Sequence, residues 1–162
     1  MAKARKWLHE KVRGTERTGV LVTKEVAKFK PLAIHILPTG DENAVHWFLE
    51  DKTDTRSSNY LEDAATEIQA QGLELDYTCL LWDADMRYED GKWRFYNFNG
   101  NTRWNEVTGD SESKQEKVKY MLNAYRALLT RARAGMVICI PEGNPNKHKA
   151  VLGGQHPAAG VL

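Results

Sequence analysis

The order of apolar and polar residues along the chain predicts helices and strands in alternation. Residues 2–12 place their apolar side chains at helical spacing among charged ones, which is the pattern of an amphipathic helix. Short apolar runs bounded by turn residues predict strands at 19–23, 32–37, 65–68, 76–82 and 136–141. The run at 76–82 is continuous rather than alternating, so we expect it to be buried on both faces, as in a parallel sheet.

The clearest helical pattern lies in the second half of the chain. Apolar residues recur at helical spacing from Val118 to Ala132, which gives one long apolar face. Upstream, Ser113 with Glu116 matches the capping box that begins a helix. Gly135 suits the left-handed residue just past a helix end. We therefore expect a long helix that stops just before Gly135.

Two arginines fall in the last turn of this expected helix. At about 100° per residue, Arg126 and Arg133 lie on nearly the same face, whereas Arg131 lies about 140° from Arg126. Arg131 therefore has a direction of its own, and an arginine beside a sheet is well placed to bind a phosphate. The alternative is that the late arginines only complement the helix dipole, at about 0.3–1 kcal/mol each.

An aromatic insertion separates the central strands from the long helix. Residues 86–98 predict a β-hairpin, because the Asp-Gly pair at 90–91 supplies a tight turn that tolerates positive φ. Residues 99–110 are polar and predict a loop. Seven of the fifteen aromatic residues lie between Trp82 and Trp104. They either pack the hairpin against the sheet or stack the bases of a nucleic acid.

Composition indicates one α/β domain, which we place at residues 1–143 with the hairpin inserted at about 84–104. A tail at 144–162 is rich in Gly, Pro, Asn and Ala, and we expect it to be flexible. The chain is 41% hydrophobic and 28% charged, and it has neither a membrane-spanning run nor an apolar signal segment. We therefore expect a cytoplasmic protein with no membrane partner.

Charge is unevenly distributed along the chain. Residues 1–30 carry nine Lys/Arg against three Asp/Glu, residues 41–90 carry three against fourteen, and residues 91–162 carry eleven against five. Basic ends around an acidic middle either present a basic face to nucleic acid or neutralise one another in the fold. The sequence leaves both open.

No complete catalytic motif is present in the sequence. Gly14 and Gly19 have the spacing of a phosphate-binding loop, but Val20 and Leu21 stand where the lysine and the hydroxyl are needed. The two cysteines lie in apolar runs and are expected to be buried structural thiols. The five histidines lack metal-ligand spacing, so no metal site is expected. The turn at 71–74 remains of interest, because its glycine permits close backbone approach and its Gln and Glu offer hydrogen bonds.

Two segments together resemble helicase motifs. Residues 66–76 resemble motif V of superfamily-1 DNA/RNA helicases, and residues 125–141 resemble their motif VI, in the right order and about 55 residues apart. Residues 56–67 and 80–93 are similar, more specifically, to the schlafen-group-3-type family of DNA/RNA helicases. The resemblance extends over residues 18–141.

The resemblance implies a fold and a cofactor. In such helicases two RecA-like lobes clamp ATP with Mg²⁺, and the first lobe carries the phosphate loop and the magnesium-binding acid. This chain resembles only the second lobe, which implies an α/β, RecA-like fold with a mostly parallel sheet, flanking helices and the inserted aromatic hairpin. ATP and Mg²⁺ would then bind only together with the missing first lobe.

The resemblance also implies roles for individual residues. Arg131 would be the arginine finger that meets the γ-phosphate. The candidates for nucleotide contact are Gln71, Gly72, Glu74 and Lys28, and those for nucleic-acid contact are Thr66 and Lys24. One position departs from motif V, since Ile68 stands where many superfamily-1 members have a histidine.

These features predict the second motor lobe of an ATP-dependent helicase or translocase, inactive alone, whose partners are a first RecA-like lobe and DNA or RNA. One alternative is a stand-alone nucleic-acid-binding module without ATPase activity. Another is a degenerate lobe used only for protein contacts, which an internal buried salt bridge of Arg131 would favour.

Overall fold

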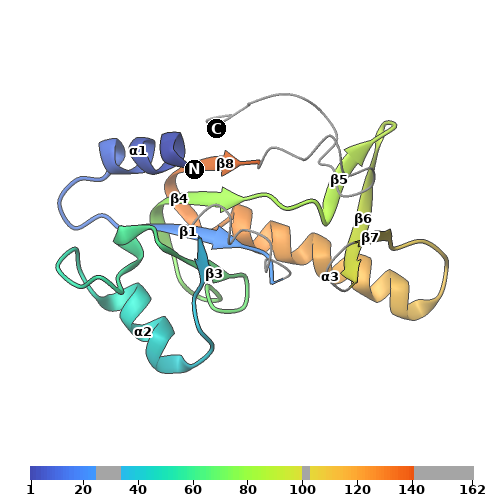
Figure 1. Cartoon of the computed structure of the whole chain (residues 1–162), viewed down its shortest axis with the longest axis horizontal. Helices are drawn as coiled ribbons and strands as arrows, with labels where there is room; N and C mark the ends of the chain where they lie inside the picture. The colour runs from blue at the N-terminus through green and yellow to red at the C-terminus, as the bar shows by residue number, and fades with distance from the viewer. Residues whose placement is uncertain (25–33, 100–102, 141–162) are drawn as a thin grey trace.

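A computed structural model describes residues 1–24, 34–99 and 103–140 of the chain (Figure 1). The helices are α1 (Ala2–Lys11), α2 (Asp41–Leu49), the 3₁₀ helix η2 (Ser58–Tyr60) and α3 (Glu112–Leu129). The strands are β1 (Thr18–Val22), β2 (His35–Ile36), β3 (Asp63–Thr66), β4 (Leu75–Leu81), β5 (Met86–Glu89), β6 (Lys92–Asn99), β7 (Arg103–Glu106) and β8 (Ala132–Cys139). Among these described helices, none has both the length and the apolar character needed to cross a membrane.

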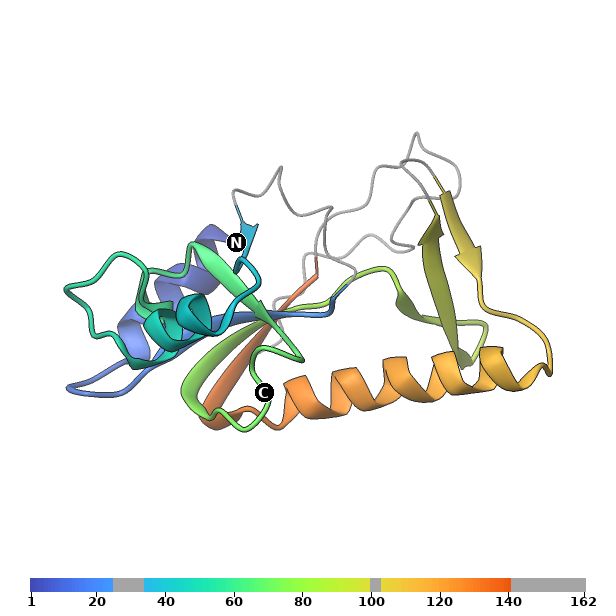
Figure 2. The ribbon, with the colours of Figure 1, turned by 90° about the horizontal axis from the view of Figure 1, so that it is seen from below.

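Five strands form one parallel sheet in the order β2-β3-β1-β4-β8, and β5-β6-β7 form a separate antiparallel sheet. The C-terminal end of the long helix α3 packs against the parallel sheet, and the helix extends from there to the small sheet (Figure 2). The predicted fold class is confirmed: the molecule is α/β, with a mostly parallel sheet, flanking helices and an added hairpin, which is consistent with a RecA-like fold.

Helices cover both faces of the parallel sheet. On one face, α1 contributes Ala4 and Leu8 to a core that includes Val20 of β1 and Cys79 of β4. On the other face, Trp47 of α2 and Leu128 of α3 pack against the alternate residues of the same strands. Every residue of β1 is buried, as expected for a central strand of a covered parallel sheet.

Close packing of α2 explains one of the two glycines with phosphate-loop spacing. A Cβ on Gly19 would lie 2.9 Å from ring atoms of Trp47 and 2.7 Å from Cδ1 of Leu75. The indole of Trp47 also donates a hydrogen bond to the Asp63 carbonyl at 3.1 Å. Gly19 therefore lets the helix approach the sheet, and this packing explains the glycine without a phosphate.

The small sheet agrees with the predicted hairpin and extends it. Asp90 and Gly91 have φ of 51° and 79°, as a tight hairpin turn requires. The expected polar loop at 99–110 is wrong in part, because residues 103–106 form β7 and pair with β6. Trp104 explains this strand, since it is buried and meets Phe98 edge-on across the pair, at 5.2 Å between ring centroids.

The predicted end of the long helix is wrong. The helix α3 ends at Leu129, because Thr130 leaves helical geometry with φ −102° and ψ 5°, and β8 begins at Ala132. Gly135 lies inside β8 rather than past a helix end. A Cβ there would lie 3.1 Å from the Tyr77 ring, so the glycine serves strand packing.

Because α3 ends at Leu129, the three arginines cannot be compared by their angles around one helix. Arg126 lies in the last turn of α3, Arg131 lies in the two-residue connection after it, and Arg133 lies on β8. The helix start also differs, because the residue in capping position is Ser111, not Ser113, and no side-chain cap bond forms.

Several other predictions differ from the structure in their bounds. The strand expected at 65–68 lies at 63–66, and α2 occupies a segment for which the pattern predicted no element. Within the expected strand 32–37, residues 35 and 36 form β2. Cys79 is buried as predicted, whereas Cys139 is only half-buried. The tail expected at 144–162 lies outside the described residues.

Candidate functional site

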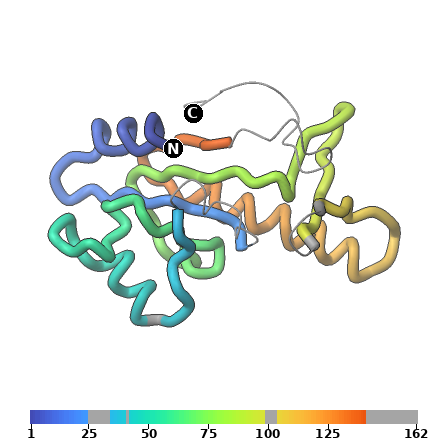
Figure 3. The backbone as a smooth tube through the Cα atoms, viewed as in Figure 1, coloured from blue at the N-terminus to red at the C-terminus, as the bar shows by residue number. Residues whose placement is uncertain are grey.

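The predicted site residues that the structure describes lie at two opposite edges of the parallel sheet. Arg131 and the turn at 71–74 lie where β4 and β8 begin, which we call the amino edge. Thr66 is the last residue of β3, and Lys24 follows the end of β1, so both lie at the carboxyl edge. The β4–β8 register pairs Leu75 with Ala132 at one edge and Leu81 with Cys139 at the other. Six residue steps separate these pairs, or about 20 Å, and the chain between β3 and β4 returns from one edge to the other (Figure 3).

Arg131 joins the end of α3 to the turn at the amino edge. Its Nε donates to the Ala127 carbonyl at 3.0 Å, and one Nη donates to the Leu73 carbonyl at 3.2 Å. Its own carbonyl accepts a hydrogen bond from the Leu75 backbone N–H at 3.0 Å. The side chain is half-buried. Arg131 and the 71–74 turn are therefore in direct contact.

The nearby carboxylates face a different arginine. Arg133 Nε lies 4.0 Å from a Glu74 carboxylate oxygen and 3.9 Å from one of Asp76. Within the described residues, Arg131 forms no ion pair. The internal salt bridge that would favour a degenerate lobe is therefore not found in this part of the chain.

The turn at 71–74 has the conformation expected from its sequence. Gly72 has φ +78°, a left-handed conformation that favours glycine, and a Cβ there would meet no atom within 4 Å. The glycine is thus required by backbone geometry rather than by crowding. Gln71 and Glu74 on either side are exposed, so their side chains are available to a ligand beside Arg131.

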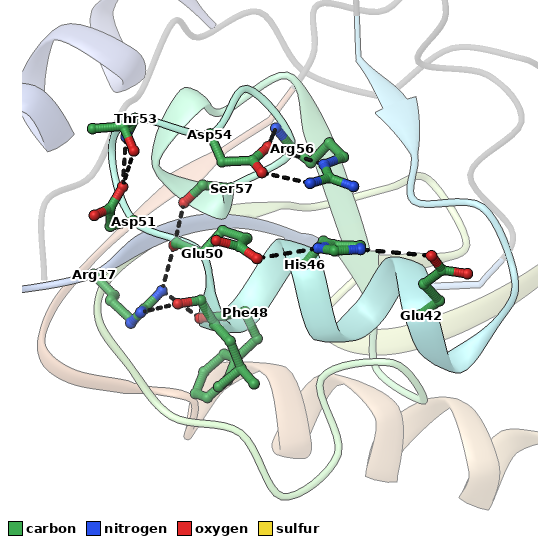
Figure 4. A network of polar contacts seen from close by, with 11 residues as sticks. Arg17, Glu42, His46, Phe48, Glu50, Asp51, Thr53, Asp54, Arg56 and Ser57 are labelled. Carbon is green, nitrogen blue, oxygen red and sulfur yellow. Dashed lines mark hydrogen bonds and ion pairs between the residues drawn. The ribbon is translucent and has the colours of Figure 1, made fainter.

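Sequence reasoning missed Arg17, which also lies at the amino edge. Its backbone N–H donates to the Asp76 carboxylate at 2.8 Å. Its guanidinium donates to three carbonyls at the end of α2, those of Phe48, Leu49 and Glu50 (Figure 4). These partners lie over thirty residues away, so no local pattern reveals them. The Arg17 guanidinium therefore caps the C-terminal end of α2. The donors that make these bonds are not free to bind a phosphate.

The loop after α2 is held by a second polar cluster (Figure 4). His46 lies 3.2 Å from Glu50, and Asp54 accepts hydrogen bonds from the Arg56 guanidinium and backbone, which hold the pKa of its carboxyl at about 2. His46, Glu50 and Asp54 are close enough together to be possible metal ligands. Arg56, however, already binds both oxygens of Asp54, so we assign this cluster to loop closure.

A buried network ties together three elements at the carboxyl edge. Asp85 is 2% exposed, and its two carboxylate oxygens accept hydrogen bonds from Tyr125 at 2.5 Å and from Thr23 at 3.1 Å. The Tyr125 oxygen in turn accepts the Asp83 backbone N–H at 3.2 Å. Burial and then the charge of Asp85 raise the pKa of Tyr125, so its phenol stays protonated.

Replacing Tyr125 with Phe tests this network. We expect a loss of about 1–3 kcal/mol in the free energy of unfolding, because the buried acceptor on Asp85 loses its donor. The free phenol of the unfolded chain ionises near pH 10, whereas the folded chain keeps it neutral. Stability should therefore fall above about pH 10 in the native chain and fall less steeply in the variant. Urea titrations across pH would measure both, with Tyr60→Phe as the exposed control; equal alkaline slopes would contradict the assignment.

Beside this network lies a cavity of about 400 Å³, which we call the carboxyl-edge cavity. It is lined by Thr23, Lys24, Glu67, Asp85, Asn97, Ser113, Glu116, Lys117, Tyr120, Met121 and Ala124. Lys24 is thus placed at this cavity. Thr66 is buried, and its hydroxyl donates to the Gln69 side chain at 3.1 Å and accepts the Gln69 N–H at 3.3 Å. Lys28 lies outside the described residues.

The comparison with protein families decides where this chain belongs. A model of the Schlafen group 3 DNA/RNA helicase domain matches residues 1–142 of the 162. The chain belongs to this family. The match supports a function related to helicases for this Schlafen group 3 domain and agrees with its α/β fold. Searches of curated proteins and of solved structures gave no match.

Proposed function

We propose that this Schlafen group 3 domain is the second RecA-like motor lobe of an ATP-dependent DNA/RNA helicase or translocase. The observation that carries the proposal is the placement of Arg131. It follows a helix, stands at the edge of a parallel sheet and contacts the 71–74 turn, and no carboxylate among the described residues neutralises it. An arginine finger that acts on the phosphate held by another lobe needs such a position.

The geometry of Arg131 fits transition-state stabilisation. A guanidinium has five N–H donors in a rigid plane, and the Ala127 and Leu73 carbonyls accept two of them. Three donors remain for the oxygens of a γ-phosphate. Because two carbonyls already fix the plane, little side-chain entropy is lost when a phosphate binds, and the charge is in place before the reaction begins. Gln71 and Glu74 would contact the rest of the nucleotide.

ATP and Mg²⁺ would bind with the first lobe, which supplies the phosphate loop. The sequence of this chain has Val20 and Leu21 where such a loop needs a lysine and a hydroxyl. We therefore expect the purified chain to hydrolyse no ATP above background and the chain with a first lobe added to become active. Phosphate release assays test both. Turnover by the lone chain that survives Arg131→Ala would mark a contaminating ATPase, and turnover that this change abolishes would contradict the division between lobes.

A second candidate function is nucleic-acid binding by the hairpin without ATPase activity. Tyr88 and Trp93 are 64% and 47% exposed, although Phe95 and Trp104 of the same small sheet are buried. The two exposed rings meet edge-on at 5.3 Å between centroids. The aromatic residues thus divide between the two roles left open by the sequence, and Tyr88 and Trp93 are the ones available to stack bases.

Substitution of Trp93 tests the hairpin's part in nucleic-acid binding. Trp93 lines a cleft of about 320 Å³ with Trp82, Tyr88 and Ile140. Because stacking of a base on an aromatic ring contributes about 1–3 kcal/mol, Trp93→Ala should weaken binding of single strands five-fold or more. Trp93→Phe should retain most of the affinity. Fluorescence anisotropy at fixed salt measures both, and equal affinity of Trp93→Ala and the native chain would exclude the hairpin as a stacking surface.

A further inference from the structure

The walls of the carboxyl-edge cavity hold buried acceptors without donors. Within the described residues, Oε2 of Glu67 and Oδ1 of Asn97 are buried and receive no hydrogen bond. The other carboxylate oxygen of Glu67 accepts a hydrogen bond from Tyr120 at 2.7 Å, which fixes the direction of the carboxylate. Burying an acceptor without a donor is unfavourable. These two atoms therefore point to a ligand that carries N–H groups.

The position of the cavity also favours a ligand. It lies past the ends of β1 and β3 and beside β6, because Lys24, Glu67 and Asn97 line it. In open α/β sheets, ligands bind outside the carboxyl ends of the strands. The Asp85 carboxylate is already held by Thr23 and Tyr125, so the wall is rigid on that side. A volume of about 400 Å³ is enough for one nucleobase with its sugar.

The remaining lining residues suit a base and its phosphate. Tyr120 is half exposed, and Met121 and Ala124 add apolar surface from the same face of α3. Lys24 and Lys117 bring two positive charges to a cavity that is also lined by the three acids Glu67, Asp85 and Glu116. A phosphate would pair with the lysines, and the donor-bearing edge of the base would meet the acceptors.

We propose that the carboxyl-edge cavity binds an adenine or cytosine of a single-stranded nucleic acid through the exocyclic amino group of the base. A carboxylate accepts from the amino group of cytosine, and an asparagine pairs with the amino group and ring nitrogen of adenine. Uracil presents a carbonyl oxygen at the same place. This oxygen would face Glu67 Oε2, and two acceptors without a proton between them form no hydrogen bond. This inference rests on the proposed function, because the base belongs to the nucleic-acid strand that the lobe would bind. It goes beyond the proposed function by naming the base.

The first experiment measures base preference with the full chain. Fluorescence anisotropy at one fixed salt concentration compares oligo-A, oligo-C and oligo-U RNA of equal length. We expect oligo-A and oligo-C to bind about ten-fold more tightly than oligo-U. Glu67→Gln and Asn97→Ala should each reduce this ratio towards one. Glu62→Gln, which changes an exposed carboxylate just before β3, should leave it unchanged.

A second experiment separates this inference from the proposed function. NMR titration with adenosine, cytidine and uridine tests the cavity without a strand, and shifts of α3 and β6 resonances with the two amino-bearing nucleosides are expected. Equal affinity for all three oligonucleotides would overturn the base preference and leave the helicase proposal intact. Nucleoside binding with the expected preference, but no strand binding, would support the cavity and count against the helicase proposal. Loss of preference in Glu62→Gln would overturn the assignment to this cavity.

Discussion

Replacing Arg131 with Ala should reduce the ATPase rate of the chain combined with its first lobe by about 10³-fold or more. The reason is that, in the proposed function, the guanidinium would supply positive charge and three hydrogen-bond donors to the γ-phosphate as its charge is redistributed. The loss should appear in kcat, because in that proposal the first lobe would hold most of the ground-state nucleotide. Single-turnover phosphate release with saturating ATP measures it directly.

The matched control is Arg126→Ala. Arg126 is an exposed arginine in the last turn of α3, so it offers the helix dipole the same charge without contacting the 71–74 turn. Its loss should leave kcat within about two-fold, since a surface charge near a helix end contributes only about 0.3–1 kcal/mol to stability. Equal losses in the two variants would show that the effect comes from the helix end and not from an arginine finger.

Arg131→Lys distinguishes charge from geometry at the same position. A lysine retains the positive charge but lacks the planar set of donors that binds two carbonyls and a phosphate together. We expect it to recover little of the lost rate. Full activity of this variant would mean that Arg131 acts as a point charge alone.

The direction expected for Arg131 rested on an incorrect helix end. Helical spacing continued through Ala132, and Gly135 resembled a helix stop, so the expected direction of Arg131 was calculated on a helix that has already ended. Pairing of β8 with β4 decides the true boundary, because the ladder begins with Leu75 opposite Ala132. Strand pairing between residues more than fifty positions apart cannot be read from local periodicity. Here the strand pairing overrides the helical periodicity of the sequence.

The parallel sheet was more predictable than its edges. Continuous apolar runs, such as β1 and β4, signal strands buried on both faces. No such pattern marks the acceptors of the carboxyl-edge cavity, because Glu67 and Asn97 lie thirty residues apart in the sequence. They line the same cavity only because β6 packs against α3. The same holds for the cap that Arg17 places on α2. Contacts between distant segments are known only once the chain is folded, and both edges of the parallel sheet are built from such contacts.

Replacing Trp47 with Ala should have the largest effect on stability in this chain. Trp47 is 1% exposed and fills the space between α2 and β1. Truncation removes about 3–5 kcal/mol from the free energy of unfolding, because it leaves a cavity and also deprives the Asp63 carbonyl of its indole donor. Urea denaturation followed by circular dichroism measures the change. Trp93→Ala, at a half-exposed site, is the control and should cost far less.

A second substitution tests whether Trp47 acts through Gly19. In the native chain Gly19→Ala should cost about 1–3 kcal/mol, because the added Cβ would lie 2.9 Å from the indole ring. In the Trp47→Ala background the ring is absent, and of the three contacts only that with Cδ1 of Leu75 remains. The two changes should therefore be less than additive by about 1 kcal/mol or more. Strict additivity would mean that the glycine is needed for a reason other than the approach of α2, and the packing explanation for its place in β1 would fail.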